Sequence, residues 1–77
     1  MTPISPTFDG LTLGERLAIL RRRAGLTQAT LAVRVGCSAS ALSDYERGRV
    51  AMSARTARDT CLALGVSADY LLLGVAS

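Results

Sequence analysis

The fold is decided by residues 27–48, TQATLAVRVGCSASALSDYERG. The stretch starts with Thr27, whose hydroxyl can cap the free N–H groups at the start of a helix. Apolar residues then recur at the spacing of one helix face, and Gly36 stands where that helix would end. Ser38 can cap another helix, and Gly48 can end it. The stretch therefore predicts two short helices joined by only a few residues.

The shortness of this connection predicts how the two helices pack. They must cross at a large angle, which is the geometry of a helix-turn-helix. Three residues fit that geometry at the spacing Ala-x3-Gly-x5-Leu. Ala32 is small where the helices approach most closely, and Gly36 allows a positive φ in the turn. Leu42 then fixes the later helix to the core, and we expect Tyr45 to face inward beside it.

Further helical segments flank this motif. Thr12 and Glu15 have the form of a capping box and open a segment that Gly25 closes. Two later segments, residues 53–65 and 67–74, also begin at a serine and end at a glycine. No stretch alternates with period two for long enough to indicate a strand. The sequence therefore predicts an all-α fold, a compact bundle of five helices.

The composition of the chain argues against several classes of function. The chain has 77 residues, of which 49% are hydrophobic and 19% charged, as in one folded domain. We place a flexible N-terminal arm at residues 1–10 and the domain at residues 11–77. With no His and only two Cys, we expect no metal site, no cofactor and no catalytic activity. A net charge of +3 allows nucleic-acid binding without requiring it.

Neither a membrane span nor a secretion signal is expected. The longest uncharged run, residues 24–33, is too short to cross a bilayer. The N-terminus lacks the basic flank and apolar stretch of a signal peptide. Cys37 and Cys61 are interpreted as reduced core residues of a cytosolic protein. We therefore expect the chain to act in the cytoplasm, at the nucleoid.

Residues between Leu11 and Gly74 match a known pattern in register. They are Arg16-Leu17, Leu20-Arg21, Gly25-Leu26-Thr27-Gln28, Leu31-Ala32, Val35-Gly36, Leu42-Ser43, Tyr45-Glu46-Arg47-Gly48 and the run 63–72. In these residues the chain resembles the lambda-repressor/Cro-like helix-turn-helix domains of phage and bacterial regulators. The resemblance implies a five-helix bundle whose third helix enters the major groove of DNA.

The resemblance also implies which residues contact double-stranded DNA. It places Thr27 and Gln28 against a phosphate, at a helix start that favours an anion in any case. It places Arg47 and Arg49 near the sugar-phosphate backbone. The remaining residues of this set lie at the start of the third helix and are Ser38, Ala39, Ser40, Ser43 and Asp44. The resemblance implies that all of them except Ser38 face the base edges. Spacing alone puts residues 40, 43, 44 and 47 on one polar stripe.

The third helix departs from the usual family pattern. Its first positions, residues 39–41, 43 and 44, offer short Ser and Ala side chains and one Asp, so these positions cannot form the two-bond contact of Arg to guanine or of Gln to adenine. Two interpretations of Asp44 stay open, acceptance of a bond from a cytosine amino group or repulsion of phosphates. In the fourth helix, Ala54 is expected to face the core, and Thr60 stands where leucine is usual.

Two further sets of residues have expected roles. The resemblance places Arg21 and Glu46 where the family often has an ion pair, which ties the first helix to the end of the third. The C-terminal segment is more apolar than a chain end needs. We therefore expect Tyr70, Leu72 and Leu73 to pair two copies of the chain.

The sequence thus predicts a sequence-specific DNA-binding transcriptional regulator. The expected form is a homodimeric repressor that reads the major groove of a pseudo-palindromic operator. The alternative is an antitoxin-type interaction module, in which a small protein is the partner and DNA binding is auxiliary. The short side chains of the third helix and the apolar C-terminus favour this alternative.

Overall fold

The computed structural model describes residues 10–74, which form five α-helices and no strand. The helices are α1 (Leu13–Arg23), α2 (Gln28–Val35), α3 (Ala39–Glu46), α4 (Ala54–Leu64) and α5 (Ala68–Leu73). The predicted all-α class and the five-helix architecture are confirmed. The predicted arm, apart from Gly10, lies outside the described residues. No helix within residues 10–74 is long and apolar enough to cross a membrane.

Hydroxyl residues begin every helix, as the sequence predicted. The Thr12 hydroxyl accepts a 3.1 Å bond from the Glu15 N–H, and the Glu15 carboxylate accepts a 2.8 Å bond from the Thr12 N–H. The capping box is therefore complete. The other four helices have single hydroxyl caps, at Thr27, Ser38, Ser53 and Ser67.

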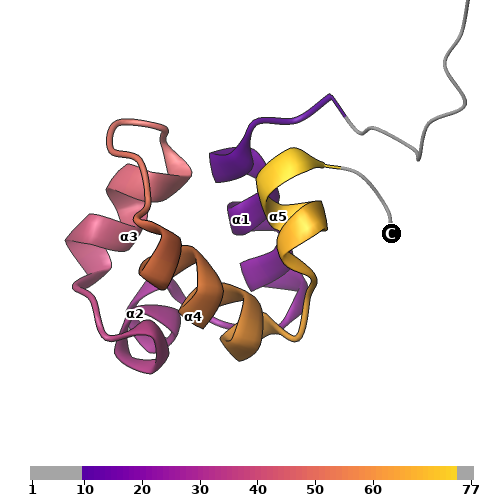
Figure 1. Ribbon diagram of the computed structural model, residues 1–77. Coiled ribbons are helices and arrows are strands. Elements are labelled where there is room, and N and C mark those ends of the chain that lie inside the picture. The colour runs from indigo at the N-terminus through magenta and orange to yellow at the C-terminus, as the bar shows by residue number, and fades with distance from the viewer. Residues whose placement is uncertain (1–9, 75–77) are drawn as a thin grey trace, which may run out of the picture.

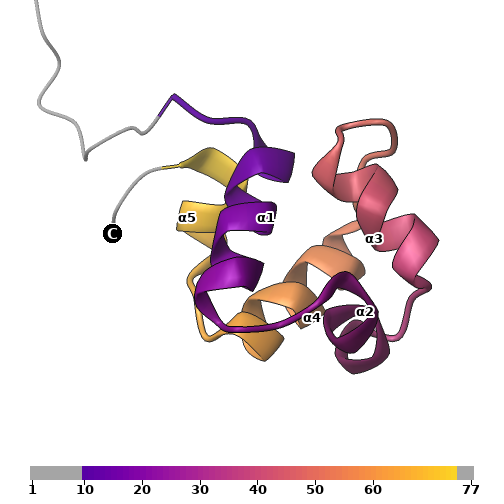
Figure 2. The same cartoon turned by 180° about the vertical axis from the view of Figure 1, so that it is seen from behind.

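The five helices enclose one core. Figures 1 and 2 show α1 and α5 side by side, α2 and α3 on the opposite side, and α4 between the two pairs. Every helix contributes a buried apolar side chain to the core, which contains Leu17, Leu31, Ala32, Leu42, Cys61 and Leu71. Tyr45 and Cys37 pack against this cluster. The predicted inward positions of Leu42 and Tyr45 are therefore correct.

Helix α4 differs from the prediction at its first residue. Ala54 is exposed, because it lies in the first turn beyond the edge of the core. Thr60 is fully buried and takes a core position instead. Its hydroxyl donates a 2.8 Å hydrogen bond to the Thr56 carbonyl oxygen one turn earlier, so burial leaves no unpaired hydroxyl proton.

A buried arginine joins α1 to α5. Arg16 is only 3% exposed, and its Nε donates a 2.9 Å hydrogen bond to the Leu71 carbonyl oxygen. Its two terminal nitrogens donate to the Leu72 carbonyl oxygen and to the Leu11 carbonyl oxygen. The cation thus stands at the carbonyl end of α5, where a helix favours positive charge. The sequence placed Arg16 in the family pattern but gave no sign of this role.

Candidate nucleic-acid interface

The turn between α2 and α3 fixes the angle between these helices. Gly36 has φ +83°, a left-handed conformation that residues with a Cβ adopt only with strain. The Ala32 carbonyl oxygen accepts bonds from the N–H groups of Gly36 (2.8 Å) and Cys37 (3.0 Å), which closes the end of α2. Ala32 and Leu42 are both buried at the junction. The chain therefore forms the helix-turn-helix that the sequence predicted.

One side of α3 faces outward. Ala39 and Ser40 are exposed, and Ser43 and Asp44 are half-buried. Arg47 lies exposed just beyond the last residue of the helix. We call these five residues the α3 surface. The Ser38 hydroxyl stands at its start and accepts a 3.0 Å bond from the Ala41 N–H, so Ser38 acts as the helix cap.

Asp44 and Arg49 face each other at the edge of the α3 surface. Their side chains are 36% and 64% exposed, and the nearest charged atoms are 3.8 Å apart. A pair this long and this exposed contributes little to stability. Both groups therefore remain free to exchange this contact for one with a charged ligand.

Gln28, at the start of α2, has a partner that the sequence did not reveal. Its carboxamide Nε2 donates a 3.0 Å hydrogen bond to Glu46 Oε1, at the end of α3. A carboxamide carries two N–H groups and an oxygen, so this bond leaves capacity for a further contact. Thr27 is exposed beside it, with its hydroxyl accepting from the Thr30 N–H. The start of α2 is thus tied to the end of α3.

Arg21 and Glu46 lie together, with side chains only 10% and 6% exposed. Arg21 Nε donates to one carboxylate oxygen at 2.6 Å, and Nη2 donates to the other at 3.1 Å. A third bond, from Nη1 to the Leu26 carbonyl oxygen at 2.9 Å, fixes the guanidinium to the loop before α2. Two-bond contacts of this kind are strong and directional. The end of α3 is therefore held from both α1 and α2.

Charge and hydrogen bonding shift the pKa of Glu46. Burial alone would raise this pKa, but the bonds from Arg21 and Gln28 and the charges of Arg21 and Arg22 outweigh burial and lower it. The Glu46 carboxylate raises the pKa of Arg21 in turn, so this pair is fully charged at neutral pH.

The lowered pKa of Glu46 makes stability depend on pH. The folded chain binds this proton less tightly than the unfolded chain, so the stabilisation is complete above the unfolded pKa of about 4.3. It is lost as the pH falls through the folded pKa. We expect urea unfolding to show a wild-type advantage over Glu46→Gln that is constant from pH 7 down to about pH 5 and then shrinks towards pH 3. An advantage that stays constant over the whole of this range would contradict the assignment.

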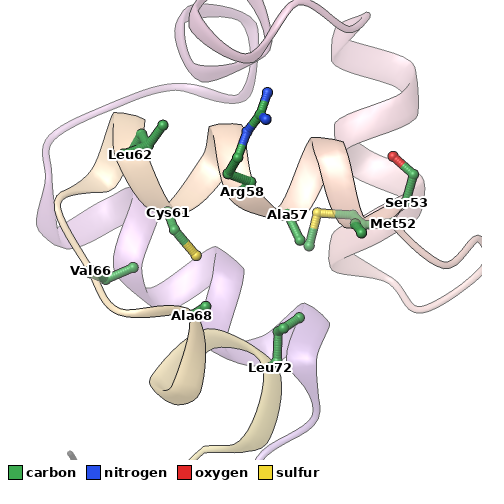
Figure 3. Close-up of a pocket in the computed structure, with 10 residues that line it drawn as sticks. Met52, Ser53, Ala57, Arg58, Cys61, Leu62, Val66, Ala68 and Leu72 are labelled. Carbon is green, nitrogen blue, oxygen red and sulfur yellow. The ribbon is translucent and has the colours of Figure 1, made fainter.

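The predicted pairing residues lie beside an apolar groove. Leu72 and Leu73 are exposed and Tyr70 is half-buried, whereas Leu71 between them is fully buried. Figure 3 shows the groove, of about 560 Å³, between α4 and α5. It is lined mainly by apolar side chains, which include Met52, Cys61, Leu62, Val66 and Leu72. Leu62 is 75% exposed at its rim.

The described residues show neither a metal-binding cluster nor a disulfide. No group of three or more His, Cys, Asp or Glu side chains in residues 10–74 is arranged to hold a metal ion. Cys37 and Cys61 are free thiols, and burial raises the pKa of Cys61 and so lowers its reactivity.

Comparisons of sequence agree on the family. A family model described as a helix-turn-helix domain matches residues 12–72. A relative from Rhodospirillum rubrum, named an uncharacterized transcriptional regulator in the ATPase CF(0) region, is 41% identical over 58 residues. The match covers 75% of this chain and 54% of the relative, so the chain spans about half the length of that protein.

Comparisons of structure agree as well. The P22 c2 repressor protein, solved in complex with a synthetic operator, is 34% identical with a TM-score of 0.78, over 80% of this chain and 94% of that one. The restriction-modification controller protein C.AhdI from Aeromonas hydrophila is 33% identical with a TM-score of 0.75, over 78% and 91%. SinR, solved in complex with DNA, is 28% identical with a TM-score of 0.74, over 78% and 97%. The chain therefore belongs to the helix-turn-helix domain family, whose lambda-repressor-like members are transcriptional regulators and not enzymes.

Proposed function

We propose that this chain is a sequence-specific DNA-binding regulator, a homodimeric repressor that reads the major groove of a pseudo-palindromic operator. The observation that carries the proposal is the fixed orientation of α3, whose end is bonded to both Arg21 and Gln28 through Glu46. A helix held in this way presents the α3 surface as a rigid unit. The P22 c2 repressor and SinR, both solved with DNA, have the same fold.

Phosphates are bound on both sides of α3 in this proposal. Arg47 and Arg49 are exposed next to the end of the helix and reach the sugar-phosphate backbone on one side. On the other side, Thr27 and Gln28 stand at the start of α2, where free N–H groups and the helix dipole attract a phosphate. The bond from Gln28 to Glu46 then links a phosphate contact directly to the end of α3.

The base edges are read by the short residues of α3. Ala39 offers a methyl group to thymine, Ser40 and Ser43 offer hydroxyl groups, and Asp44 accepts a bond from a cytosine amino group. Such contacts discriminate less than two-bond contacts do. Part of the specificity therefore comes from the sequence-dependent shape of the DNA, which the phosphate contacts sense.

Repression follows from occupancy. A dimer bound at a promoter excludes polymerase from the same DNA, and this needs no catalytic step. The site of action is the nucleoid, in the cytoplasm. Binding two half-sites on one face of the duplex requires the two copies of α3 to lie about one helical turn apart.

Pairing of two copies uses the end of α5. Leu72 and Leu73 are exposed there, and the groove beside them continues the apolar surface to Leu62 on α4. A second copy that covers these leucines removes their apolar surface from water, which drives association. Dimerisation through this surface leaves the α3 surface of each copy free for DNA.

Leu73→Glu is expected to break the dimer, because it puts a charge into the apolar interface. Sedimentation at tens of micromolar should then show a dimer for the wild type and a monomer for the variant. Val33→Glu is the matched control and should remain dimeric, since Val33 is an apolar residue on α2 that is even more exposed than Leu73, at 81% against 60%. The wild-type melting temperature should also rise with protein concentration. A wild-type monomer under these conditions contradicts the proposal.

The same groove supports a second candidate function, a module that binds a small protein. SinR has also been solved in a complex with SinI, and it is 29% identical to this chain with a TM-score of 0.74. Purification of the tagged chain from its native host separates the two functions. A bound promoter fragment supports the repressor, whereas a small protein in equal amount and no DNA supports the second function.

Selection from a pool of random duplexes tests the proposed function. The repressor predicts an enriched motif with two related halves whose centres lie about ten base pairs apart. A pool without any enriched motif after repeated rounds, from a folded protein, would overturn sequence-specific binding.

A further inference from the structure

Gly14 lies in the first turn of α1 at a point of close contact with α3. It is buried, and a Cβ built on it would lie 2.6 Å from the Tyr45 carbonyl oxygen and 2.9 Å from the Glu46 carbonyl carbon. The Glu46 carbonyl oxygen would be closer still. Carbon atoms do not approach other atoms this closely without displacement. The missing side chain is therefore what allows the two helices to touch here.

Helix propensity does not explain this glycine. Glycine inside a helix is less favourable than alanine because it has more backbone freedom to lose. Gly14 lies inside α1 and its φ is not positive, so its backbone has ordinary helical geometry. Alanine at this position would stabilise α1 if nothing lay against it. The atoms that do lie against it belong to the backbone of α3, which cannot move aside by changing a rotamer.

The contact adds to the restraints on one end of α3. Tyr45 and Glu46 form the last turn of the helix, and the Glu46 side chain is already bonded to Arg21 and Gln28. Figure 2 shows the first turn of α1 facing this end of α3. Arg16, on the same helix, bonds to the end of α5. Helix α1 therefore sets where α3 lies relative to α5.

We propose that Gly14 is a positioning residue for DNA recognition, whose missing side chain lets the last turn of α3 rest on α1 and so fixes the angle at which α3 meets DNA. This rests on the proposed function. An added methyl group pushes the end of α3 outward and tilts its base-reading face. Phosphate contacts tolerate such a tilt better than base contacts, because they depend on charge more than on a specific alignment.

Gly14→Ala tests the proposal on two duplexes, the selected operator and a random sequence. We expect operator affinity to fall about tenfold, the scale of removing one base contact, and random-DNA affinity to change much less. Ala63→Gly in α4 is the control. It destabilises the fold through backbone freedom, but Ala63 lies beside Arg34 and Asp59, on a helix that packs mainly against α2 and α5, so it should leave the ratio of the two affinities unchanged.

A second readout does not depend on DNA. In the free protein, Gly14→Ala should shift the NMR signals of the Gln28 carboxamide and of the Tyr45 and Glu46 amides, and Ala63→Gly should not. All measurements are made in trimethylamine N-oxide, which favours the folded state. An unchanged affinity ratio, unshifted signals, or a Gly14→Ala variant that is unfolded even in this medium would overturn the positioning role. If the wild-type protein binds operator and random DNA equally, the proposed function is overturned. The NMR shifts of the free protein then still show whether Gly14 sets the position of α3.

Discussion

Arg21→Met is expected to lower the free energy of unfolding by about 3–5 kcal/mol, because it leaves the Glu46 carboxylate buried without its counter-charge. The wild-type pair is bonded at 2.6 and 3.1 Å, with both side chains at most 10% exposed. A domain of this size has a total stability of only about 4–12 kcal/mol. The loss is therefore a large share of the total stability, and urea or thermal unfolding should show a clearly lower midpoint for the variant.

Two further variants identify the cause of this loss. Arg21→Met combined with Glu46→Leu should recover much of the stability, because no unpaired charge remains in the interior. Arg58→Met is the matched control, since Arg58 pairs with Asp59 at 3.0 Å but its side chain is 65% exposed. Loss of such a surface pair should cost about 1 kcal/mol or less. If Arg21→Met is as mild as this control, the buried pair does not hold α3.

Arg47→Ala is expected to weaken binding to operator and random DNA alike. A phosphate contact positions the protein but carries no sequence information. The slope of log K against log salt should become shallower by about one unit for each phosphate that the variant no longer binds, and therefore by about two for a symmetric dimer. Arg34→Ala removes the same charge from α2, beside Asp59 and Leu62 of α4, and should leave the slope nearly unchanged. Equal slopes for Arg47→Ala and the wild type would show that Arg47 does not contact a phosphate.

Asp44→Asn should behave differently. Asp44 stands on the same surface one turn before Arg47, but its proposed partner is a base edge. The substitution replaces a carboxylate, which only accepts hydrogen bonds, by a carboxamide, which both donates and accepts them. The preferred base at one position of each half-site should therefore change. One such contact is worth about 1–3 kcal/mol of discrimination, which a repeat of the duplex selection will detect. An unchanged motif with tighter binding to all DNA would favour phosphate repulsion instead.

Local signals explain why the fold could be predicted. A hydroxyl cap and a glycine stop depend on a few neighbouring residues, so Thr27, Gly36 and Ser38 sufficed to bound α2 and begin α3. The expected inward position of Ala54 is wrong, because a helix extends past the core at its first turn. Periodicity shows which face of a helix is apolar and not how far the neighbouring helices reach.

Contacts between distant residues were the part that the sequence could not supply. The bonds of Arg16 to the end of α5 span more than fifty positions, and nothing near Arg16 indicates them. The Arg21–Glu46 pair was expected only through a resemblance, whereas the Gln28 bond to the same carboxylate was not expected. Gly14 lies between the two capping-box residues Thr12 and Glu15, and nothing in that local pattern indicates a contact with α3. Its close approach to α3 depends on where the backbones of α1 and α3 meet, and this cannot be predicted from the local sequence.

In the proposed function, α3 and the start of α2 form the DNA-binding surface. Adding the selected duplex to isotope-labelled protein and following the backbone amide signals tests this proposal. We predict that the largest shifts fall on residues 27–28 and 38–49, with α4 and the groove beside Leu62 nearly unchanged. Shifts that instead concentrate on α4 and α5 would contradict the account, because the α3 surface would then not be the part of the chain that meets DNA.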